Sequence, residues 1–127
     1  MNYTTTAGVQ GICPTGWHLP TDAEWTALTT YLGGESVAGG KMKETGTMRW
    51  NSPNTGATNS NGFSGLPGGY RNAGESFYGL GDNGDFWSSS EGSATSAWTR
   101  HLNYTNANVG RATNGKGFGF SVRCLRD

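Results

Sequence analysis

The stretch PTDAEWTALTTYLGG, residues 20–34, carries the clearest secondary-structure signal in this chain of 127 residues. Thr21 and Glu24 have the spacing of a capping box, in which each side chain accepts a hydrogen bond from the other residue's backbone at the start of a helix. Two glycines at 33 and 34 favour the end of the helix. Three apolar residues fall on one helical face between these signals: Trp25, Leu28 and Leu32. We therefore predict a helix over residues 21–32 whose apolar face turns toward a core.

The composition indicates one small, aromatic core. Only 33% of the residues are hydrophobic, but five Trp, five Tyr and five Phe concentrate this material in large side chains. The chain has the length of a single domain, so we expect one domain over residues 1–127. The 22 glycines and the charged fraction of 14% indicate ordered loops and a neutral surface.

The charge and hydropathy patterns argue against several partners. The formal net charge is zero, and no basic stripe is present, so nucleic acid is not an expected partner. No apolar run approaches the roughly 18 residues of a membrane span, so we expect no direct membrane insertion. The first ten residues, MNYTTTAGVQ, lack the basic start and apolar run of a targeting signal.

Two cysteines, Cys13 and Cys124, lie near opposite ends of the chain. Their spacing matches no zinc or redox motif. In the loop-entropy description, a disulfide between them would stabilise the folded state by up to roughly 4–5 kcal/mol. The alternative is a pair of buried free thiols.

Loops and then strands are predicted after the first helix. Residues 41–44 favour a short helical turn between glycines, with Met42 directed inward. Residues 45–70 read as an ordered loop that sends three side chains into the core: Trp50, Phe63 and Leu66. Strand patterns cover residues 77–80, 85–89, 97–104 and 118–125.

Residues 98–105 alternate between two kinds of side chain, as a strand with two different faces does. One row is predicted to face the core: Trp98, Arg100, Leu102 and Tyr104. Within it, Arg100 needs a polar partner or a path to water. The other row is small and polar and is predicted to face solvent: Thr99, His101, Asn103 and Thr105. A polar loop follows over residues 106–116, where binding function commonly lies.

Four blocks of the sequence resemble one bacterial family. They are Cys13-Pro14-Thr15-Gly16-Trp17-His18-Leu19-Pro20-Thr21-Asp22-Ala23-Glu24-Trp25, Gly68-Gly69-Tyr70-Arg71, Phe86-Trp87-Ser88-Ser89-Ser90-Glu91 and Gly119-Phe120-Ser121-Val122-Arg123-Cys124. In this order they resemble the Fib-succ-major, or FISUMP, major paralogous domain. The resemblance spans nearly the whole chain and implies that the family's first strand lies upstream of Met1.

The resemblance implies an α+β domain with the C-type-lectin-like fold, similar to the formylglycine-generating, sulfatase-modifying proteins. In that fold we expect the helix over 21–32 to pack on a small twisted antiparallel sheet, with long ordered loops and with the termini close together. The resemblance also agrees with a disulfide between Cys13 and Cys124.

The C-terminal part also resembles the variable region of proteins diversified by diversity-generating retroelements. This resemblance implies a fixed frame of Trp98, Arg100, Leu102, Tyr104, Val109, Arg111 and the strand from Phe120 to Cys124. Aromatic and Arg side chains are also frequent anchors at interfaces, so we add Tyr70 and Arg71 to the expected ligand-binding residues. The expected ligand-binding residues are Thr99, His101, Asn103, Thr105, Asn106, Asn108, Gly110, Ala112, Thr113, Asn114, Gly115, Tyr70, Arg71 and Glu91.

Catalysis and metal binding are not expected. Chemistry like formylglycine generation needs a pair of reactive cysteines near the C-terminus, and only Cys124 lies there. Neither His18 nor His101 has metal-ligand spacing, and no carboxylate near His101 in the sequence is placed to orient it. His18 is read as a packing residue, Trp87 and Trp98 as core residues, and residues 82–85 as a turn rather than a calcium loop. We expect no cofactor.

The sequence thus predicts a non-catalytic recognition module, such as a surface adhesin or receptor-binding domain. Its ligand would be a protein or glycan on another cell or surface. The expected location is extracellular or on a bacterial cell surface, as part of a longer exported protein. The alternative is a structural or assembly module with no dedicated ligand, and an oxidase of the formylglycine-generating kind is a third reading.

Overall fold

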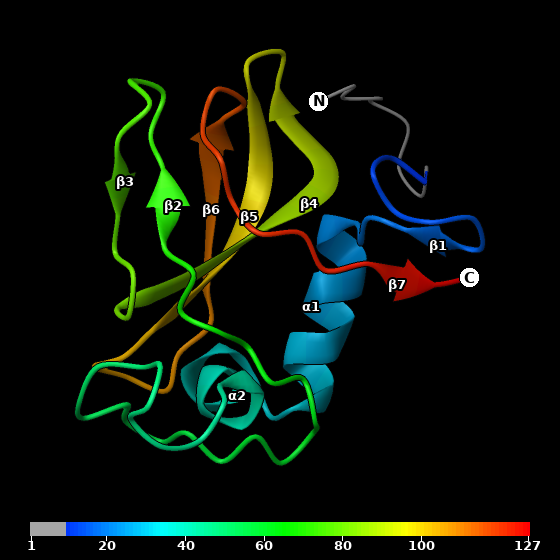
Figure 1. Ribbon diagram of the computed structural model, residues 1–127. Helices are drawn as coiled ribbons and strands as arrows, with labels where there is room; N and C mark the ends of the chain where they lie inside the picture. The colour runs from blue at the N-terminus through cyan, green and yellow to red at the C-terminus, as the bar shows by residue number, and fades with distance from the viewer. Residues whose placement is uncertain (1–9) are drawn as a thin grey trace.

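The computed structural model describes residues 10–127, and this part of the chain is an α+β structure with two helices and small antiparallel sheets. Its elements are β1 (Trp17–His18), α1 (Asp22–Tyr31), α2 (Glu35–Met42), β2 (Tyr70–Arg71), β3 (Phe77–Tyr78), β4 (Asn83–Ser93), β5 (Ser96–Asn103), β6 (Gly110–Gly115) and β7 (Leu125–Arg126) (Figure 1). The predicted α+β class is confirmed. The interpretation of MNYTTTAGVQ concerns residues that lie almost entirely outside the described part.

Helix α1 forms where the sequence predicted it. Thr21 Oγ1 accepts a hydrogen bond from the Glu24 backbone N at 3.1 Å, and a Glu24 carboxylate oxygen accepts one from the Thr21 backbone N at 2.8 Å. This capping box fixes the start of the helix, and Leu32 caps its end. Trp25 and Leu32 are buried, so the apolar face of α1 does turn toward the core.

Helix α2 starts earlier than the sequence predicted. The predicted turn over 41–44 is wrong, because the helix runs from Glu35 to Met42 through Gly39 and Gly40. Both glycines allow other backbone segments to approach closely: a Cβ at Gly39 would lie 2.1 Å from the Asn108 carbonyl oxygen, and one at Gly40 would lie 2.3 Å from that of Gly56. Tertiary packing thus outweighs their low helix propensity. Met42 is fully buried, as expected.

Strands β4, β5 and β6 form the largest sheet, with β5 in the centre. The strands predicted over 85–89 and 97–104 are confirmed as parts of β4 and β5, and the one over 77–80 as β3. The polar loop predicted over 106–116 contains β6, which the sequence did not indicate. Its Gly, Ala, Thr and Asn residues have little strand preference of their own, and pairing with β5 forms the strand.

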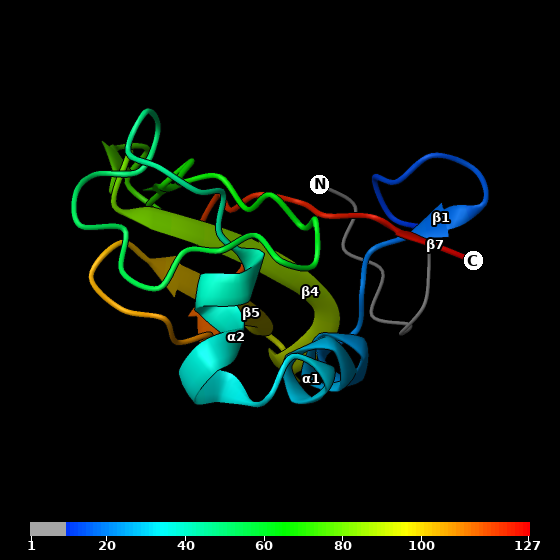
Figure 2. The same cartoon turned by 90° about the horizontal axis from the view of Figure 1, so that it is seen from below.

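The helices cover one face of this sheet and the C-terminal segment covers the other, as Figure 2 shows. On the helix side, the rings of Trp25, Phe63 and Phe86 meet with centroids 5.6–5.9 Å apart. Trp50 is also buried there, whereas Leu66, which was predicted to enter the core, is 44% exposed. The prediction for Leu66 is wrong. Backbone hydrogen bonds at the neighbouring Gly65 and Pro67 hold the loop, and the Leu66 side chain points outward.

The strand predicted over 118–125 does not form as one element. Its first half makes only isolated bridges, Arg71 with Gly119 and Phe86 with Ser121, and its end forms β7. Ser121 exchanges backbone hydrogen bonds with β4 at Asp85 and Trp87. The segment therefore crosses from the β2–β3 hairpin to the edge of β4 and lays Phe120 against Trp87, with ring centroids 4.6 Å apart.

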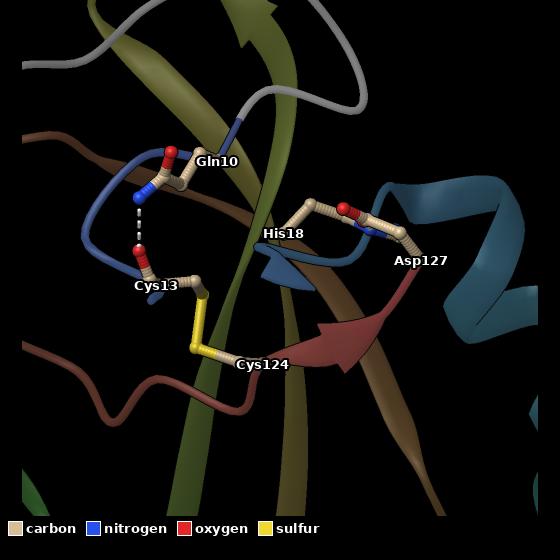
Figure 3. The surroundings of a disulfide bond; sticks show 5 residues. All are labelled: Gln10, Cys13, His18, Cys124 and Asp127. Carbon is tan, nitrogen blue, oxygen red and sulfur yellow. Dashed lines mark hydrogen bonds and ion pairs between the residues drawn. A yellow bond between two sulfur atoms is a disulfide. The ribbon is translucent and has the colours of Figure 1, made fainter. Parts of the chain in front are cut away.

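The two ends of the described chain meet. Strand β1 pairs antiparallel with β7, so that His18 lies opposite Leu125. Cys13 and Cys124 form a disulfide beside this pair, and no free cysteine remains in the chain (Figure 3). The predicted disulfide is confirmed, and the free-thiol alternative is excluded. The predicted proximity of the termini involves residues 1–9, which lie outside the described part.

Two residues of the predicted core row behave differently from one another. Arg100 is 2% exposed and finds its partner in Asp22 on α1, at 2.7 Å. Trp98 is only half-buried, so its assignment to the core is wrong. The guanidinium of Arg111, on the neighbouring strand β6, stacks on the Trp98 ring 3.7 Å from its centroid.

Candidate functional site

A group of polar side chains gathers on the face of the sheet that the helices do not cover. The register places Asn83 opposite Asn103, Asp85 opposite His101 and Trp87 opposite Thr99, and directly opposed residues point to the same face. Thr99 and Ala112 are likewise opposed across β5 and β6, two positions before Asn114. We call this group the polar floor; its members are Asn83, Asp85, Thr99, His101, Asn103 and Asn114.

His101 is oriented by a carboxylate, contrary to the expectation from the sequence. Its Nδ1 is hydrogen-bonded to Asp85 Oδ1. The two residues are 16 positions apart and meet only because β4 and β5 pair. Asp85 is 5% exposed, and its second oxygen, Oδ2, is buried without a hydrogen-bond partner in residues 10–127.

Thr99 does not face solvent, so this part of the prediction is wrong. It is fully buried, and its hydroxyl lies 3.0 Å from both His101 Nε2 and the Ala112 carbonyl oxygen. Asn114 Nδ2 donates to the same hydroxyl at 2.9 Å. The packed rings of Trp87 and Phe120 occupy this side of the sheet, which the alternating pattern predicted to face solvent. Thr99 therefore positions His101 and Asn114.

Aromatic rings border the polar floor and enclose a hollow of about 310 Å³, which we call the ring hollow. The rings of Tyr70, Phe118 and Phe120 form its wall, with centroids 5.7–6.2 Å apart. Phe120 also meets His101 edge to face at 6.2 Å. The ring hollow is lined by Tyr70, Asn83, Asp85, His101, Asn103, Asn114, Phe118 and Phe120.

A second hollow of about 360 Å³ adjoins the first, since both include His101 and Asn103. We call it the loop hollow, because half of its lining comes from the turn between β5 and β6. It is lined by His101, Asn103, Thr105, Asn106, Asn108 and Gly110. Together the two neighbouring hollows are lined by amides, hydroxyls, one imidazole, one carboxylate and three aromatic rings.

The loop that supplies this second hollow is held by a buried lysine. Lys43 is fully buried, and its ammonium donates to the carbonyl oxygens of Thr55, Asn103 and Asn106 at 2.8–2.9 Å. Burial lowers the pKa of Lys43 to about 8. The sequence analysis assigned Lys43 no role beyond a helical turn, because its partners are as far as 63 positions away.

Backbone contacts with α2 hold the same loop. Gly40 N donates to the Ala107 carbonyl at 3.0 Å, and Val109 N donates to that of Glu35 at 2.8 Å. The close approach at Gly39 adds to this attachment. Such a loop can present side chains without being ordered first by a ligand.

Several predicted contact residues lie elsewhere. Thr113 pairs with Trp98 and so belongs to the helix-side face, and Gly115 lies at the far end of β6. Arg71 donates to the Asn72 and Gly117 carbonyls and approaches Glu75, while Glu91 pairs with Lys116. Ala112 lies on the same face of the sheet as the polar floor, but its contact there is its carbonyl oxygen, which accepts a hydrogen bond from Thr99. Local backbone pairing, invisible in the sequence, separates these residues from the two hollows.

The structure therefore keeps part of the predicted site and adds to it. The predicted residues that line a hollow are Tyr70, His101, Asn103, Thr105, Asn106, Asn108, Gly110 and Asn114. The sequence analysis missed Asn83, Asp85, Phe118 and Phe120. Alternation along 83–87 was a usable signal for the first two, since it places Asn83 and Asp85 on the face of Trp87.

The described residues show neither a metal-ligating cluster nor a membrane-spanning helix. Within residues 10–127, no group of three or more His, Cys, Asp or Glu side chains is placed to hold a metal ion. In the stretch once compared with a calcium loop, Asp82 accepts a hydrogen bond from Asn51 and Asp85 contacts His101. No helix of the described part has the length and apolar character needed to cross a membrane.

The fold and this surface define the class of protein: a small α+β domain, closed by a disulfide between neighbouring ends, with a polar concave surface on the face of its sheet opposite the helices. The chain belongs to the Fibrobacter succinogenes major domain family (Fib_succ_major), which matches residues 2–126. The family resemblance inferred from the four sequence blocks is confirmed. Searches of curated proteins and of solved structures found no match.

Proposed function

We propose that the chain is a non-catalytic ligand-recognition domain and that the ring hollow and the loop hollow form its contact surface. The observation that carries this proposal is that two neighbouring hollows share His101 and Asn103 on a fixed frame. Their volumes of about 310 and 360 Å³ fall within the range of roughly 300–1,000 Å³ seen for ligand sites.

Catalysis is the weaker reading of the same residues. Thr99, His101 and Asp85 have the side chains of a nucleophile, a base and an orienting acid. However, Thr99 is fully buried and its hydroxyl bonds the Ala112 carbonyl, so a substrate has no access to it. Both cysteines are held in the disulfide, which leaves no thiol pair for an oxidase of the formylglycine-generating kind.

We also propose that the fold is C-type-lectin-like and related to the formylglycine-generating proteins, and that the C-terminal region is of the retroelement-diversified kind. Adjacent ends, a closing disulfide and long ordered loops support the first part. For the second, expected ligand-binding residues of this region such as His101, Asn103 and Thr105 line the hollows, while frame residues such as Arg100 and Leu102 are buried. Thr99 is a buried exception.

A location outside the cell, as part of a longer exported surface protein, fits the disulfide. Disulfides persist in oxidising environments and are rare in the cytosol. The ligand would then be a protein or glycan on another cell or surface. The structural or assembly module stays as the second candidate, favoured by the exposed Phe77 and Leu80 beside the β2–β3 hairpin.

The test is a paired screen on glycan and protein arrays, followed by alanine variants in the loop hollow. Thr105→Ala and Asn108→Ala should each weaken binding about threefold to tenfold without changing the thermal midpoint. Thr113→Ala is the matched control, because Thr113 is exposed on the opposite face of β6. Equal binding by all three variants, or no ligand on either array, would favour the structural module.

A further inference from the structure

We infer that the ring hollow binds one neutral sugar ring of a glycan, with its aromatic wall against the C–H face of the sugar and its amide and carboxylate groups on the hydroxyls. This inference rests on the proposed recognition function and deepens it. The ligand class follows from three features of the hollow: its aromatic wall, the polar floor and the absence of Lys and Arg from its lining.

The wall offers an apolar surface next to polar groups. Tyr70 and Phe118 are half-buried, so their rings are partly accessible from the hollow that they line. Phe120 behind them is packed on Trp87 and cannot easily turn away. A pyranose has an apolar face of C–H groups and a rim of hydroxyls, and it matches a site with rings on one side and hydrogen-bonding groups on the other.

The floor has hydrogen-bonding capacity that the protein leaves unused. Asn103 Nδ2 donates to Asn83 Oδ1, but within residues 10–127 the Asn83 amide nitrogen donates to no acceptor. Asn114 uses its nitrogen on Thr99, and its Oδ1 accepts no hydrogen bond in the same part of the chain. These two groups provide one donor and one acceptor at the hollow, and the lining also includes Asp85, whose Oδ2 is a buried acceptor without a partner in residues 10–127.

Asp85 is the most telling of these groups. A buried acceptor without a partner is unusual and costs free energy, so a hydroxyl donor supplied by a ligand, or an intervening water that the ligand retains, would relieve that cost. The other oxygen of the carboxylate is already committed to His101. A hydroxyl-bearing ligand can provide the missing donor, and an acceptor-only ligand cannot.

The charge of the lining selects against anionic ligands. Neither hollow is lined by a Lys or Arg side chain, and the ring hollow contains a carboxylate. Phosphorylated, sulfated or acidic sugars would therefore lack a cationic partner. A protein epitope is also a poorer match, because a standard protein interface buries about 800 Å² on each partner over a broad surface.

The experiment is a glycan array carrying neutral and acidic glycans, probed once with calcium and once with EDTA, followed by titration calorimetry with the methyl glycoside of the sugar selected. We expect neutral glycans to bind and EDTA to have no effect, because no metal-ligating cluster lies in the described residues. Preference for acidic glycans, loss of binding in EDTA or no glycan binding at all would each overturn the inference.

Variants then locate the sugar. Phe118→Ala and Asn114→Ala should each lower affinity about tenfold, whereas Phe118→Trp should retain binding because it keeps an aromatic face. Tyr31→Ala is the matched control, since Tyr31 is an aromatic residue on α1 with 86% exposure. Circular dichroism and thermal midpoints check that each variant is folded. Full binding of a neutral glycan by folded Phe118→Ala would show that the sugar sits elsewhere.

The two proposals fail in different ways. If no glycan binds but a protein from the protein array does, and Thr105→Ala or Asn108→Ala weakens that binding, the sugar inference falls and the recognition function stands. If neither array yields a ligand, both fall.

Discussion

The guanidinium of Arg100, in the middle of the central strand β5, donates a hydrogen bond to the carboxylate of Asp22 in the first turn of α1, at 2.7 Å. Arg100 also donates to the Asp22 carbonyl and to Thr26. Burial alone would raise the pKa of Asp22, but the hydrogen bonds from Arg111 and Arg100 outweigh it and hold that pKa below its usual value. The pair ties the helix to the sheet on the face opposite the two hollows.

Replacing this arginine should destabilise the domain. Arg100→Met keeps most of the side-chain volume but removes four donated hydrogen bonds from a buried region. We expect a loss of about 2–4 kcal/mol in the free energy of unfolding, measured by urea denaturation. Arg111→Met is the control and should cost less, because Arg111 is partly exposed. Equal stability of Arg100→Met and the wild type would mean that the buried pair is not stabilising.

The disulfide should contribute much of the stability. It joins residues 111 positions apart, and the loop-entropy description gives up to about 4–5 kcal/mol for a loop of this length. The double variant Cys13→Ser, Cys124→Ser should therefore unfold at a much lower urea concentration. Reduced wild-type protein should behave like the variant. An unchanged midpoint in both would show that β1 and β7 stay paired without the bond.

A methyl group at Gly39 should disturb the turn between β5 and β6 as well as α2. Ala normally favours a helix over Gly by about 1 kcal/mol, but the new Cβ would lie 2.1 Å from the Asn108 carbonyl. We expect Gly39→Ala to lower stability by about 1–3 kcal/mol and to weaken ligand binding, measured by denaturation and calorimetry. Ser36→Ala, at an exposed position of the same helix, should be neutral or slightly stabilising. A stabilised Gly39→Ala would contradict the close packing.

Lys43 should control the order of residues 103–109. Lys43→Met fills similar space but leaves three carbonyl oxygens without their donor. Hydrogen exchange should speed up at amides of this loop more than at amides of β4. Lys41→Met is the control, because Lys41 donates only to Leu32, away from the loop. Unchanged exchange in the loop would show that the contacts with α2 suffice.

The contribution of His18 should depend on pH. Hydrogen bonds to Asp127 and then to Glu24 raise the pKa of His18 above its usual value of 6.5. Protonation is thus favoured in the folded state, so the stabilisation is complete below about pH 6.5 and is lost as pH rises through the raised pKa. The stability difference between wild type and His18→Gln should be larger at about pH 5.5 than at about pH 8.5. A difference that is constant or grows with pH would contradict this assignment.

The register of β4 and β5 explains why the sequence did not reveal the site. A regular hairpin closed at Ser93 and Ser96 would place Asp85 opposite Tyr104. Two register shifts, between Trp87 and Glu91 and between Glu91 and Ser93, instead place Asp85 opposite His101. Bulges insert unpaired residues, and the sequence gives no reliable sign of them here. Both strands were predicted, but the contact between them was not.

Features encoded by neighbouring residues were determined by the sequence itself. The capping box and spacing of α1, the aromatic core residues Trp25 and Trp87, and the family membership can all be read from residues 13–124 in order. They depend on hydrogen bonds and periodicity within a few positions, or on burial of large apolar side chains in any compact fold.

Only the tertiary structure decided which side chains form the two hollows. Thr99 was predicted to face solvent and is buried. Asp85 and Phe118 were not among the expected binding residues and line the ring hollow, and Lys43 holds a loop about 60 positions away. Each of these outcomes depends on strand register and on which segment covers which face of the sheet. Those arrangements follow from the packing of the whole chain, because no local stretch contains both partners of any of these contacts.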